Sequence, residues 1–433
     1  MKTFLLNYKI KHLRIEILMM FVMFVMFVMI GLVFSCKTIN EISYTNLASN
    51  YNPEVNLQID GARIFHESDS LSRVFLQYNT AGFKYLIPRG KEYFRADYSI
   101  SYQLFSSYES NTLIDEGTFY KRDSLYYKNA GMLKFDFPVA ADFPGEYLLE
   151  VKISDLNADQ TVLYPLQIEK NIKNSSQWFL PVDEPGDAIL DEWISWKTKF
   201  RIKCSDKEIK KLFVGYFEVN FPIASPPFSQ DRPEVYDYEA DKKFVVEIRD
   251  GISEELQFAN EGIYHFTADE DARQGISLFR FEDYFPKVKK SEQLGPPLRY
   301  LTSNKEYEKL RNASDLKQVV DDFWIETAGN EDRAEELIKL FYGRVEQANK
   351  LFSSHKEGWK TDRGMIYIIF GTPKTVYNRS DIETWIYGEQ GNRVFLTFDF
   401  IRAINPFTEN DFELQRQPEF KEQWYNAVLF WRQ

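Results

Sequence analysis

The sequence predicts a multidomain, mainly β protein in which two tandem β-sandwiches precede a C-terminal α+β domain. Three observations support this prediction. The chain has 433 residues, which is more than one hydrophobic core usually organises. Upstream of residue 287, apolar residues alternate with polar ones, as they do in half-buried strands. Downstream of residue 298 the apolar spacing changes to the 3.6-residue period of helices.

The composition indicates folded domains and argues against nucleic acid as a partner. Apolar residues make up 44% of the chain and aromatic residues 16%, which supplies ample material for a core. The chain has 53 Lys and Arg against 65 Asp and Glu, so its formal net charge is −12. A protein that binds a phosphate backbone needs a basic surface, and this chain offers none by composition.

The N-terminus has the features of an export signal. Four basic residues precede an apolar run from Ile17 to Phe34. This charge order favours insertion with the positive end inside the cell. The run is also long enough to span a bilayer, so a permanent anchor and an ordinary signal peptide are alternatives to a lipoprotein signal.

The residues after the apolar run favour lipidation. Val33-Phe34-Ser35-Cys36 resembles a bacterial lipobox, in which the cysteine is diacylated and becomes the new N-terminus. We therefore expect residues 1–35 to be a lipoprotein signal peptide, Cys36 to be the lipidated residue, and 36–50 to form a tether.

The second cysteine, Cys204, is predicted to be a buried and inert thiol. It follows an alternating apolar pattern from residue 200, which is typical of a strand. If Cys36 carries lipid, no disulfide can form, so the core alone must stabilise an exported chain.

Residues 51–170 are predicted to form the first β-sandwich. Val55, Leu57 and Ile59 alternate with polar residues, and a longer alternation begins at Phe94. An Asp-x-Pro-Gly-x-Tyr sequence at 142–147 precedes a further strand. It resembles the penultimate strand of immunoglobulin-like and fibronectin-like modules, in which the tyrosine hydrogen-bonds to backbone at a corner.

Residues 177–286 are predicted to form a second sandwich of the same kind. Gly262-Ile263-Tyr264 repeats the Gly-x-Tyr strand of the first module. Asp250-Gly251 is a strong hairpin signal. The stretch from Phe221 to Pro233 holds four prolines, so we expect a long loop over this sandwich.

A linker at 287–298 leads into the α+β domain at 299–433. Ser303, Ser314 and Asn330 are predicted N-caps of three helices. Strands are expected at 365–370, 384–387 and 393–401. A last helix is predicted to begin at Pro418 and to carry Phe420, Trp424 and Trp431 on one face.

The most informative stretch is 358–373, which reads Gly-Trp-Lys-Thr-Asp-Arg-Gly-Met-Ile-Tyr-Ile-Ile-Phe-Gly-Thr-Pro. It resembles the signature of the GWxTD-domain family, envelope lipoproteins of Bacteroidota and related bacteria. The matching positions are Gly358, Trp359, Thr361, Asp362, Arg363, Gly364, Tyr367, Gly371 and Pro373. The resemblance covers roughly the last third of the chain, and it implies an envelope setting without a settled enzymatic activity.

The motif has two physical interpretations. In the structural one it is a turn from a helix to a strand, in which Thr361 and Asp362 bond backbone N–H groups and Gly364 takes a positive φ. Trp359 is then buried, and Arg363 pairs with Asp362 or Glu383. In the catalytic one, Asp362 and Arg363 form a reactive pair supported by Glu383. We favour the structural interpretation, because a carboxylate beside an arginine is a poor general base.

Other catalytic and metal-binding templates do not match. The four histidines are scattered and lack the spacing of zinc ligands. No nucleophile elbow, phosphate-binding loop or dinucleotide fingerprint occurs. We therefore expect no metal and no cofactor. The eight tryptophans suggest sugar stacking as an alternative, but most lie at periodic positions that favour core burial.

Together these observations predict a lipid-anchored, non-enzymatic scaffold or accessory subunit of an outer-membrane protein assembly or secretion complex. Its expected partners are the outer membrane and an outer-membrane β-barrel or other envelope proteins. The alternatives are an envelope hydrolase or peptidase with a site near Asp362 and Glu383, and a glycan-binding surface lipoprotein. The side of the membrane that it faces is not predicted.

Overall fold

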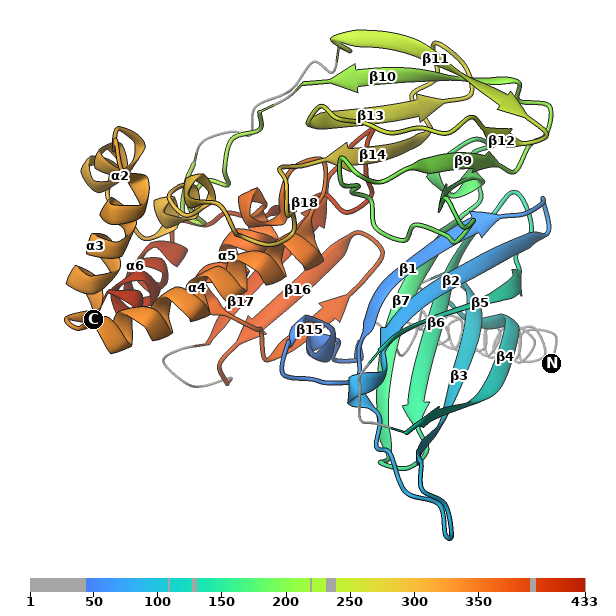
Figure 1. Ribbon diagram of the computed structural model, residues 1–433, viewed down its shortest axis with the longest axis horizontal. Coiled ribbons are helices and arrows are strands. Elements are labelled where there is room, and N and C mark those ends of the chain that lie inside the picture. The colour runs from blue at the N-terminus through green and yellow to red at the C-terminus, as the bar shows by residue number, and fades with distance from the viewer. Residues whose placement is uncertain are drawn as a thin grey trace, which may run out of the picture.

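The computed structural model describes residues 44–107, 110–126, 131–218, 220–230, 239–389 and 395–432 (Figure 1). The predicted signal, the lipobox and Cys36 lie outside these residues. Among the described helices, none has both the length and the hydropathy that crossing a bilayer requires.

The first domain is a sandwich of two antiparallel sheets with strand orders β1-β2-β5 and β4-β3-β6-β7. Its core lies between the sheets and includes Val74, Ile100 and Val151, all fully buried. The Tyr147 hydroxyl donates to the Asp142 carbonyl oxygen at 2.8 Å, which confirms the predicted tyrosine corner. The strands are β1 (Ile59–His66), β2 (Leu71–Asn79), β3 (Phe94–Ser107), β4 (Ser110–Leu125), β5 (Met132–Ala140), β6 (Glu146–Asp155) and β7 (Gln160–Glu169).

The second domain is one seven-stranded sheet of order β14-β13-β10-β11-β12-β9-β8, and its main core includes residues from most of these strands. Tyr264 repeats the tyrosine corner, since its hydroxyl donates to the Asn260 carbonyl oxygen at 3.0 Å. Asp250 and Gly251 both have positive φ, which confirms the predicted hairpin. The strands are β8 (Phe179–Asp183), β9 (Phe200–Cys204), β10 (Lys211–Phe217), β11 (Lys242–Arg249), β12 (Ile252–Ser253), β13 (Gly262–Thr267) and β14 (Ile276–Arg280).

Two further features of the second domain concern the predicted thiol and loop. Cys204 is buried in the core, and burial raises the pKa of its thiol to about 12, as expected for an inert cysteine. The described part of the predicted loop, 221–230, contains no helix or strand. However, this loop packs on the C-terminal domain. The Ala224 N–H donates to the Lys360 carbonyl oxygen, and Ala224 is buried in the core of that domain.

The C-terminal domain packs helices on an antiparallel sheet of order β15-β16-β17-β18 (Figure 1). Its core joins α4 and α5 to the sheet through residues such as Phe352, Tyr367 and Trp385. The helices are α2 (Asn304–Arg311), α3 (Leu316–Ala328), α4 (Glu331–Phe352), α5 (Asp362–Phe370) and α6 (Phe420–Trp431). The strands are β15 (Thr375–Asn378), β16 (Ile382–Tyr387), β17 (Leu396–Arg402) and β18 (Phe412–Leu414).

The helix caps show where local sequence signals hold and where they fail. Ser303 forms the predicted capping box, and Asn330 caps α4. The prediction of Ser314 as a cap is wrong by one residue, because the Asp315 carboxylate accepts from the Gln318 N–H and begins α3. The last helix begins at Phe420, two residues after the predicted start.

The prediction of a strand at 365–370 is wrong, because these residues form most of α5. Residues 362–369 are all buried, so the segment lacks the one-sided apolar stripe that identifies a surface helix. A short apolar run of this kind does not distinguish a buried helix from a buried strand.

Each of the three domains contacts the other two (Figure 1). Arg63 of the first domain donates to the Asp191 carbonyl oxygen of the second at 3.0 Å. The loop between β17 and β18 inserts Phe407 into an apolar cluster of the second domain that includes Phe217 and Phe279. Arg402 of β17 pairs with Glu169 of the first domain at 3.3 Å. The chain therefore folds into one closed body rather than a linear string.

A cluster of carboxylates lies where the three domains meet. Burial, followed by the neighbouring Glu409 carboxylate, raises the pKa of Glu169 to about 8, although Arg402 opposes the shift. Burial also raises the pKa of Glu409, whose carboxylate accepts from the Ser176 hydroxyl at 3.2 Å. Glu192 of the second domain is half-buried nearby, and desolvation raises its pKa as well. Arg402 thus faces two carboxylates, Glu169 and Glu409, while Arg63 opposes the shift at Glu192.

We expect this junction to weaken as the pH rises. The pKa of Glu169 is higher in the folded protein than in the unfolded chain, so the folded state binds the proton more tightly. The free energy of unfolding should therefore fall between about pH 5 and pH 8. Thermal unfolding across this range should show a flatter pH dependence for Glu169→Gln than for the wild type. The exposed Glu208 provides the control, and a Glu208→Gln profile as flat as that of Glu169→Gln would contradict the assignment.

Candidate functional site

The motif lies in the C-terminal domain and joins α4 to the sheet. A single 3₁₀ turn, η7 (Gly358–Lys360), packs on α4, and α5 follows directly. Gly371 ends α5 with φ of +82°, a conformation that favours glycine. The motif is thus a turn into a buried helix rather than a turn into a strand.

Two motif glycines are required by close backbone contacts. A Cβ on Gly358 would lie 1.9 Å from the Ala348 carbonyl oxygen of α4. A Cβ on Gly364 would lie 1.8 Å from the Gly358 carbonyl oxygen. The prediction of a positive φ at Gly364 is wrong, because this residue is helical and is needed for space instead.

Thr361 is the N-cap of α5. Its hydroxyl accepts from the Gly364 N–H at 3.0 Å and donates to the Gly358 carbonyl oxygen at 2.8 Å. This confirms the prediction that Thr361 bonds a neighbouring N–H, and it satisfies a donor that helix formation leaves unpaired.

Asp362 is the first residue of α5, and its carboxylate is hydrogen-bonded by Leu414 and Arg416. Its carboxylate accepts from the Leu414 N–H at 2.8 Å and from both terminal nitrogens of Arg416, one of them at 3.0 Å. The partner is therefore Arg416 and not the adjacent Arg363. The bond to Leu414 fixes β18 against the first turn of α5, where the helix dipole also favours a negative charge.

Arg363 and Glu383 form a second buried pair, with 3.4 Å between Nη1 and Oε2. Arg363 also donates to the Asn410 carbonyl oxygen at 2.9 Å, and its guanidinium lies 4.2 Å from the centre of the Phe412 ring. The predicted pairing of Arg363 with Glu383 is confirmed.

Glu383 is the centre of this network and is 2% exposed. Besides Arg363, its carboxylate accepts from the Trp385 indole at 2.5 Å and from the Tyr51 hydroxyl at 3.1 Å. Burial, with the Glu383 charge as the next cause, raises the pKa of Tyr51 well above its ordinary value, so the phenol stays protonated and donates.

Tyr51 belongs to a segment, residues 44–52, that we call the strap. The Leu47 N–H donates to the Val376 carbonyl oxygen at 2.9 Å, and the Val376 N–H donates to Asn46 Oδ1 at 3.0 Å. Asn46 also donates to the Lys374 carbonyl oxygen at 3.1 Å. The strap therefore adds to the outer edge of β15.

Trp359 and Tyr367 complete the motif as packing residues. Trp359 is buried. Its backbone N–H donates to Asn349 Oδ1 at 3.1 Å, and its backbone carbonyl oxygen accepts from the Tyr300 hydroxyl at 2.9 Å. The Tyr367 hydroxyl donates to the Tyr51 carbonyl oxygen at 3.0 Å, so the motif holds the strap by its backbone as well.

Sequence reasoning missed Arg416, Asn410 and Tyr51 as members of this site. They come from segments up to 332 residues away from their partners, and none lies in a recognisable motif. The acidic and basic residues of 358–373 were visible in the sequence, but the identity of their partners was not.

None of the described histidines bonds to a motif side chain, although His355 pairs with Asp411, the residue next to Asn410. Burial lowers the pKa of His66, His265 and His355 to about 4 in each case. His66 bonds Ser72 and His265 bonds Ser277, both at 2.9 Å. Within the described residues, no three His, Cys, Asp or Glu side chains are grouped to hold a metal ion.

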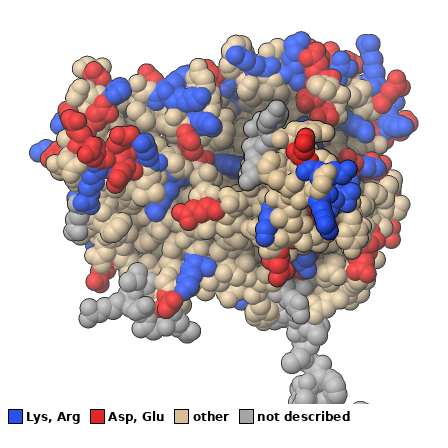
Figure 2. Space-filling model, turned by 60° about the horizontal axis from the view of Figure 1, so that its bottom comes forward, with Lys and Arg blue, Asp and Glu red and all other residues tan. Residues whose placement is uncertain are grey.

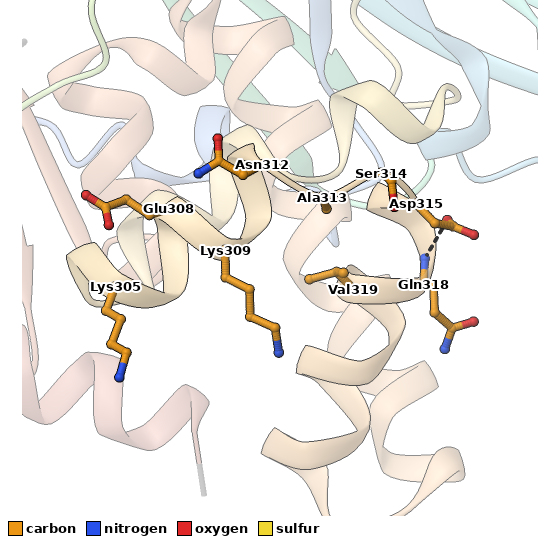
Figure 3. Close-up of a pocket in the computed structure, with 9 residues that line it drawn as sticks. All are labelled: Lys305, Glu308, Lys309, Asn312, Ala313, Ser314, Asp315, Gln318 and Val319. Atoms are coloured by element: carbon orange, nitrogen blue, oxygen red, sulfur yellow. Dashed lines mark hydrogen bonds between the residues drawn. The ribbon is translucent and has the colours of Figure 1, made fainter.

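A surface pocket of about 540 Å³ lies between α2 and α3, away from the motif (Figure 3). Figure 3 shows Lys305 and Lys309 projecting from α2, while the Asp315 side chain is bonded to the Gln318 N–H at the start of α3. None of the motif residues lines this pocket.

Comparisons with known proteins identify the C-terminal region. Residues 262–433 match the model of the GWxTD domain. The match begins at β13, so the family unit includes the last two strands of the second domain as well as the α+β domain. No curated protein matches the chain.

Among solved structures, the BSP domain of a biofilm-associated protein is similar over 53% of this chain, with 10% sequence identity and a TM-score of 0.21. The chain spans 30% of the length of that structure.

The glycine contacts predict a sharp contrast between two alanine substitutions. Gly358→Ala places a methyl group against backbone, so it should lower the free energy of unfolding by about 3 kcal/mol or more. Gly343→Ala is the matched control, because nothing lies within 4 Å of its Cβ in α4 and alanine favours helix by about 1 kcal/mol. Denaturant unfolding of both variants measures the difference, and equal stabilities would refute the packing assignment.

Asp362→Asn tests whether the motif carboxylate is structural. The amide keeps the shape but loses the charge opposite Arg416, so we expect a loss of about 1.5 to 3 kcal/mol in the free energy of unfolding. Asp332→Asn, at the exposed start of α4, should cost only a few tenths of a kcal/mol. An Asp362→Asn protein that is as stable and abundant as the wild type, yet inactive in cells, would favour the catalytic interpretation.

Proposed function

Because this chain belongs to the GWxTD-domain family, we propose that it is a lipid-anchored, non-enzymatic scaffold or accessory subunit of an outer-membrane protein assembly or secretion complex. The main support is that the charged side chains of the motif bond to the chain itself. Asp362 holds β18, and Glu383 joins the strap to β16 and α5. Charged side chains used in this way stabilise the fold and are not free to act on a substrate.

The arrangement of the domains also supports this proposal. Three domains that contact one another in a closed body keep a fixed shape, which a subunit needs when it presents surfaces to partners. The lipobox sequence supports attachment to a membrane, and the outer membrane is the setting that the family resemblance implies.

The same contacts weigh against the hydrolase and glycan-binding alternatives. Asp362 and Glu383 have their hydrogen-bonding capacity taken up by arginine, indole, phenol and backbone donors, which leaves neither carboxylate poised as a base. Of the tryptophans that the structure describes, Trp196 alone is exposed, so the described tryptophans do not line up as a stacking platform for sugars.

We expect labelled palmitate to enter the wild-type protein and to be absent from Cys36→Ala.

We also expect crosslinking in outer membranes, followed by size analysis in mild detergent, to place the protein in a complex larger than its 51.2 kDa chain. A durable interface of this kind buries about 1,200 to 2,000 Å² or more. A protein that migrates alone and whose purified ectodomain cleaves an envelope peptide or glycan would replace the scaffold with an enzyme.

A further inference from the structure

The strap is bound by two different sets of contacts. At its start, the Leu47 N–H bonds to the Val376 carbonyl oxygen of β15, and the Asn46 side chain bonds to the Val376 N–H and to the Lys374 carbonyl oxygen just before the strand. Leu47 and the neighbouring Ala48 are both buried in the core of the C-terminal domain. The start of the strap is therefore part of the fold of that domain, although the two segments are more than 300 residues apart in sequence.

At its end, Tyr51 fills a site between the end of α4, β16 and Tyr367 of the motif. Its ring lies 5.4 Å from the Phe352 ring and 5.5 Å from the Trp385 ring, measured between centroids. Its hydroxyl donates to Glu383, and its carbonyl oxygen accepts from Tyr367. Without Tyr51, the buried Glu383 carboxylate would lose one of its three donors.

The strap also touches the first domain. Asn50 donates through its amide to the Leu163 carbonyl oxygen of β7 at 3.0 Å. The strap therefore lies between the first domain and the C-terminal domain and contacts both of them.

The position of the strap constrains how the body sits on a membrane. Tyr44, the first described residue, is only eight residues after Cys36. Even a fully extended segment of this length spans at most about 28 Å. A lipid on Cys36 would hold β15, the strand next to the strap, close to the bilayer, whereas the strands β10 and β11 lie farther away, along the upper edge of the body in Figure 1.

We propose that residues 44–52 are a strap that seats the C-terminal domain against the membrane, with the β15 edge on the membrane-facing side, and that the Tyr51–Glu383 contact locks it there. The orientation, but not the lock, rests on the proposed lipidation of Cys36. The three domains are then not arrayed behind a tether at one end. The GWxTD domain is the membrane-proximal part of the body, although it is the last in sequence.

The surface agrees with orientation by a strap rather than by charge. Figure 2 turns the lower side of the Figure 1 view forward and shows acidic and basic side chains both present, separated by wide uncharged areas. A face with both signs of charge gains little from anionic headgroups. The anchor and its strap therefore set the orientation.

The lock is tested by hydrogen exchange on the full-length protein in mild detergent. In the wild type, the segments 44–52 and 374–378 should both be protected. Tyr51→Ala and Asn46→Ala should each speed exchange in both segments together by at least tenfold, while β13 and β14 keep their protection and show that the fold persists. Tyr44→Ala, at a residue that is 64% exposed, should change neither segment by more than twofold. Unprotected exchange of 44–52 in the wild type would overturn the proposal.

The orientation is tested in vesicles of phosphatidylethanolamine and phosphatidylglycerol that contain a quencher lipid. A fluorophore is attached to Glu389→Cys, beside β16, or to Lys243→Cys, on β11, because Cys204 is buried and does not compete for label. We expect quenching at 389 to exceed that at 243 by at least twofold in the lipidated protein. Adding Tyr51→Ala should remove this difference.

The possible failures are distinguishable. Equal quenching at the two positions of a vesicle-bound protein would overturn the proposed orientation. A wild-type protein that behaves like Cys36→Ala and does not bind vesicles would overturn the lipid anchor, and with it the membrane-facing role of the strap. The exchange experiment decides the lock in either case, because it needs no membrane.

Discussion

The buried carboxylate of Glu383 is the constraint on which the C-terminal half of the structure depends. An ionised group at 2% exposure is costly unless nearby donors replace the water that it loses. The chain supplies three donors from different segments: Arg363 of α5, Trp385 of β16, and Tyr51 of the strap. Satisfying one charge therefore fixes a helix, a strand and the strap relative to one another. This also explains why the first described residues, 44–52, pack on the last domain.

Hydrogen bonds of the same buried network also reach toward the other two domains. Arg363 reaches the Asn410 carbonyl oxygen in the loop between β17 and β18. That loop carries Phe407 into the apolar cluster of the second domain, and Arg402 at its start pairs with the first domain. A change at the motif thus reaches both sandwiches through one loop of the sheet. The loop is held by buried bonds at one end and apolar packing at the other, and it adds to the direct bond between the Ala224 N–H of the second domain and the Lys360 carbonyl oxygen of the motif.

Much of the fold could be predicted from the sequence, because it follows from local patterns. Alternation revealed the strands of the first domain, Ser303 and Asn330 marked helix starts, and Asp-x-Pro-Gly-x-Tyr marked a tyrosine corner. The strand predicted at 365–370 failed for a physical reason, since α5 is buried on all sides and lacks a polar face. The bonds of Asp362 to Arg416 and of Tyr51 to Glu383 could not be predicted, because they join segments that only the folded chain brings together.

The motif positions can now be explained one by one in terms of packing and capping. Gly358 and Gly364 allow two backbones to meet, Thr361 caps the helix, and Asp362 places a charge at the positive end of its dipole. These are the requirements of a helix that begins inside the protein, where water cannot satisfy its first N–H groups. A sequence signature of this kind identifies a way of building a core. The function of the motif then lies in the segments that this core holds in place. In this chain those segments include the strap, which follows the proposed anchor.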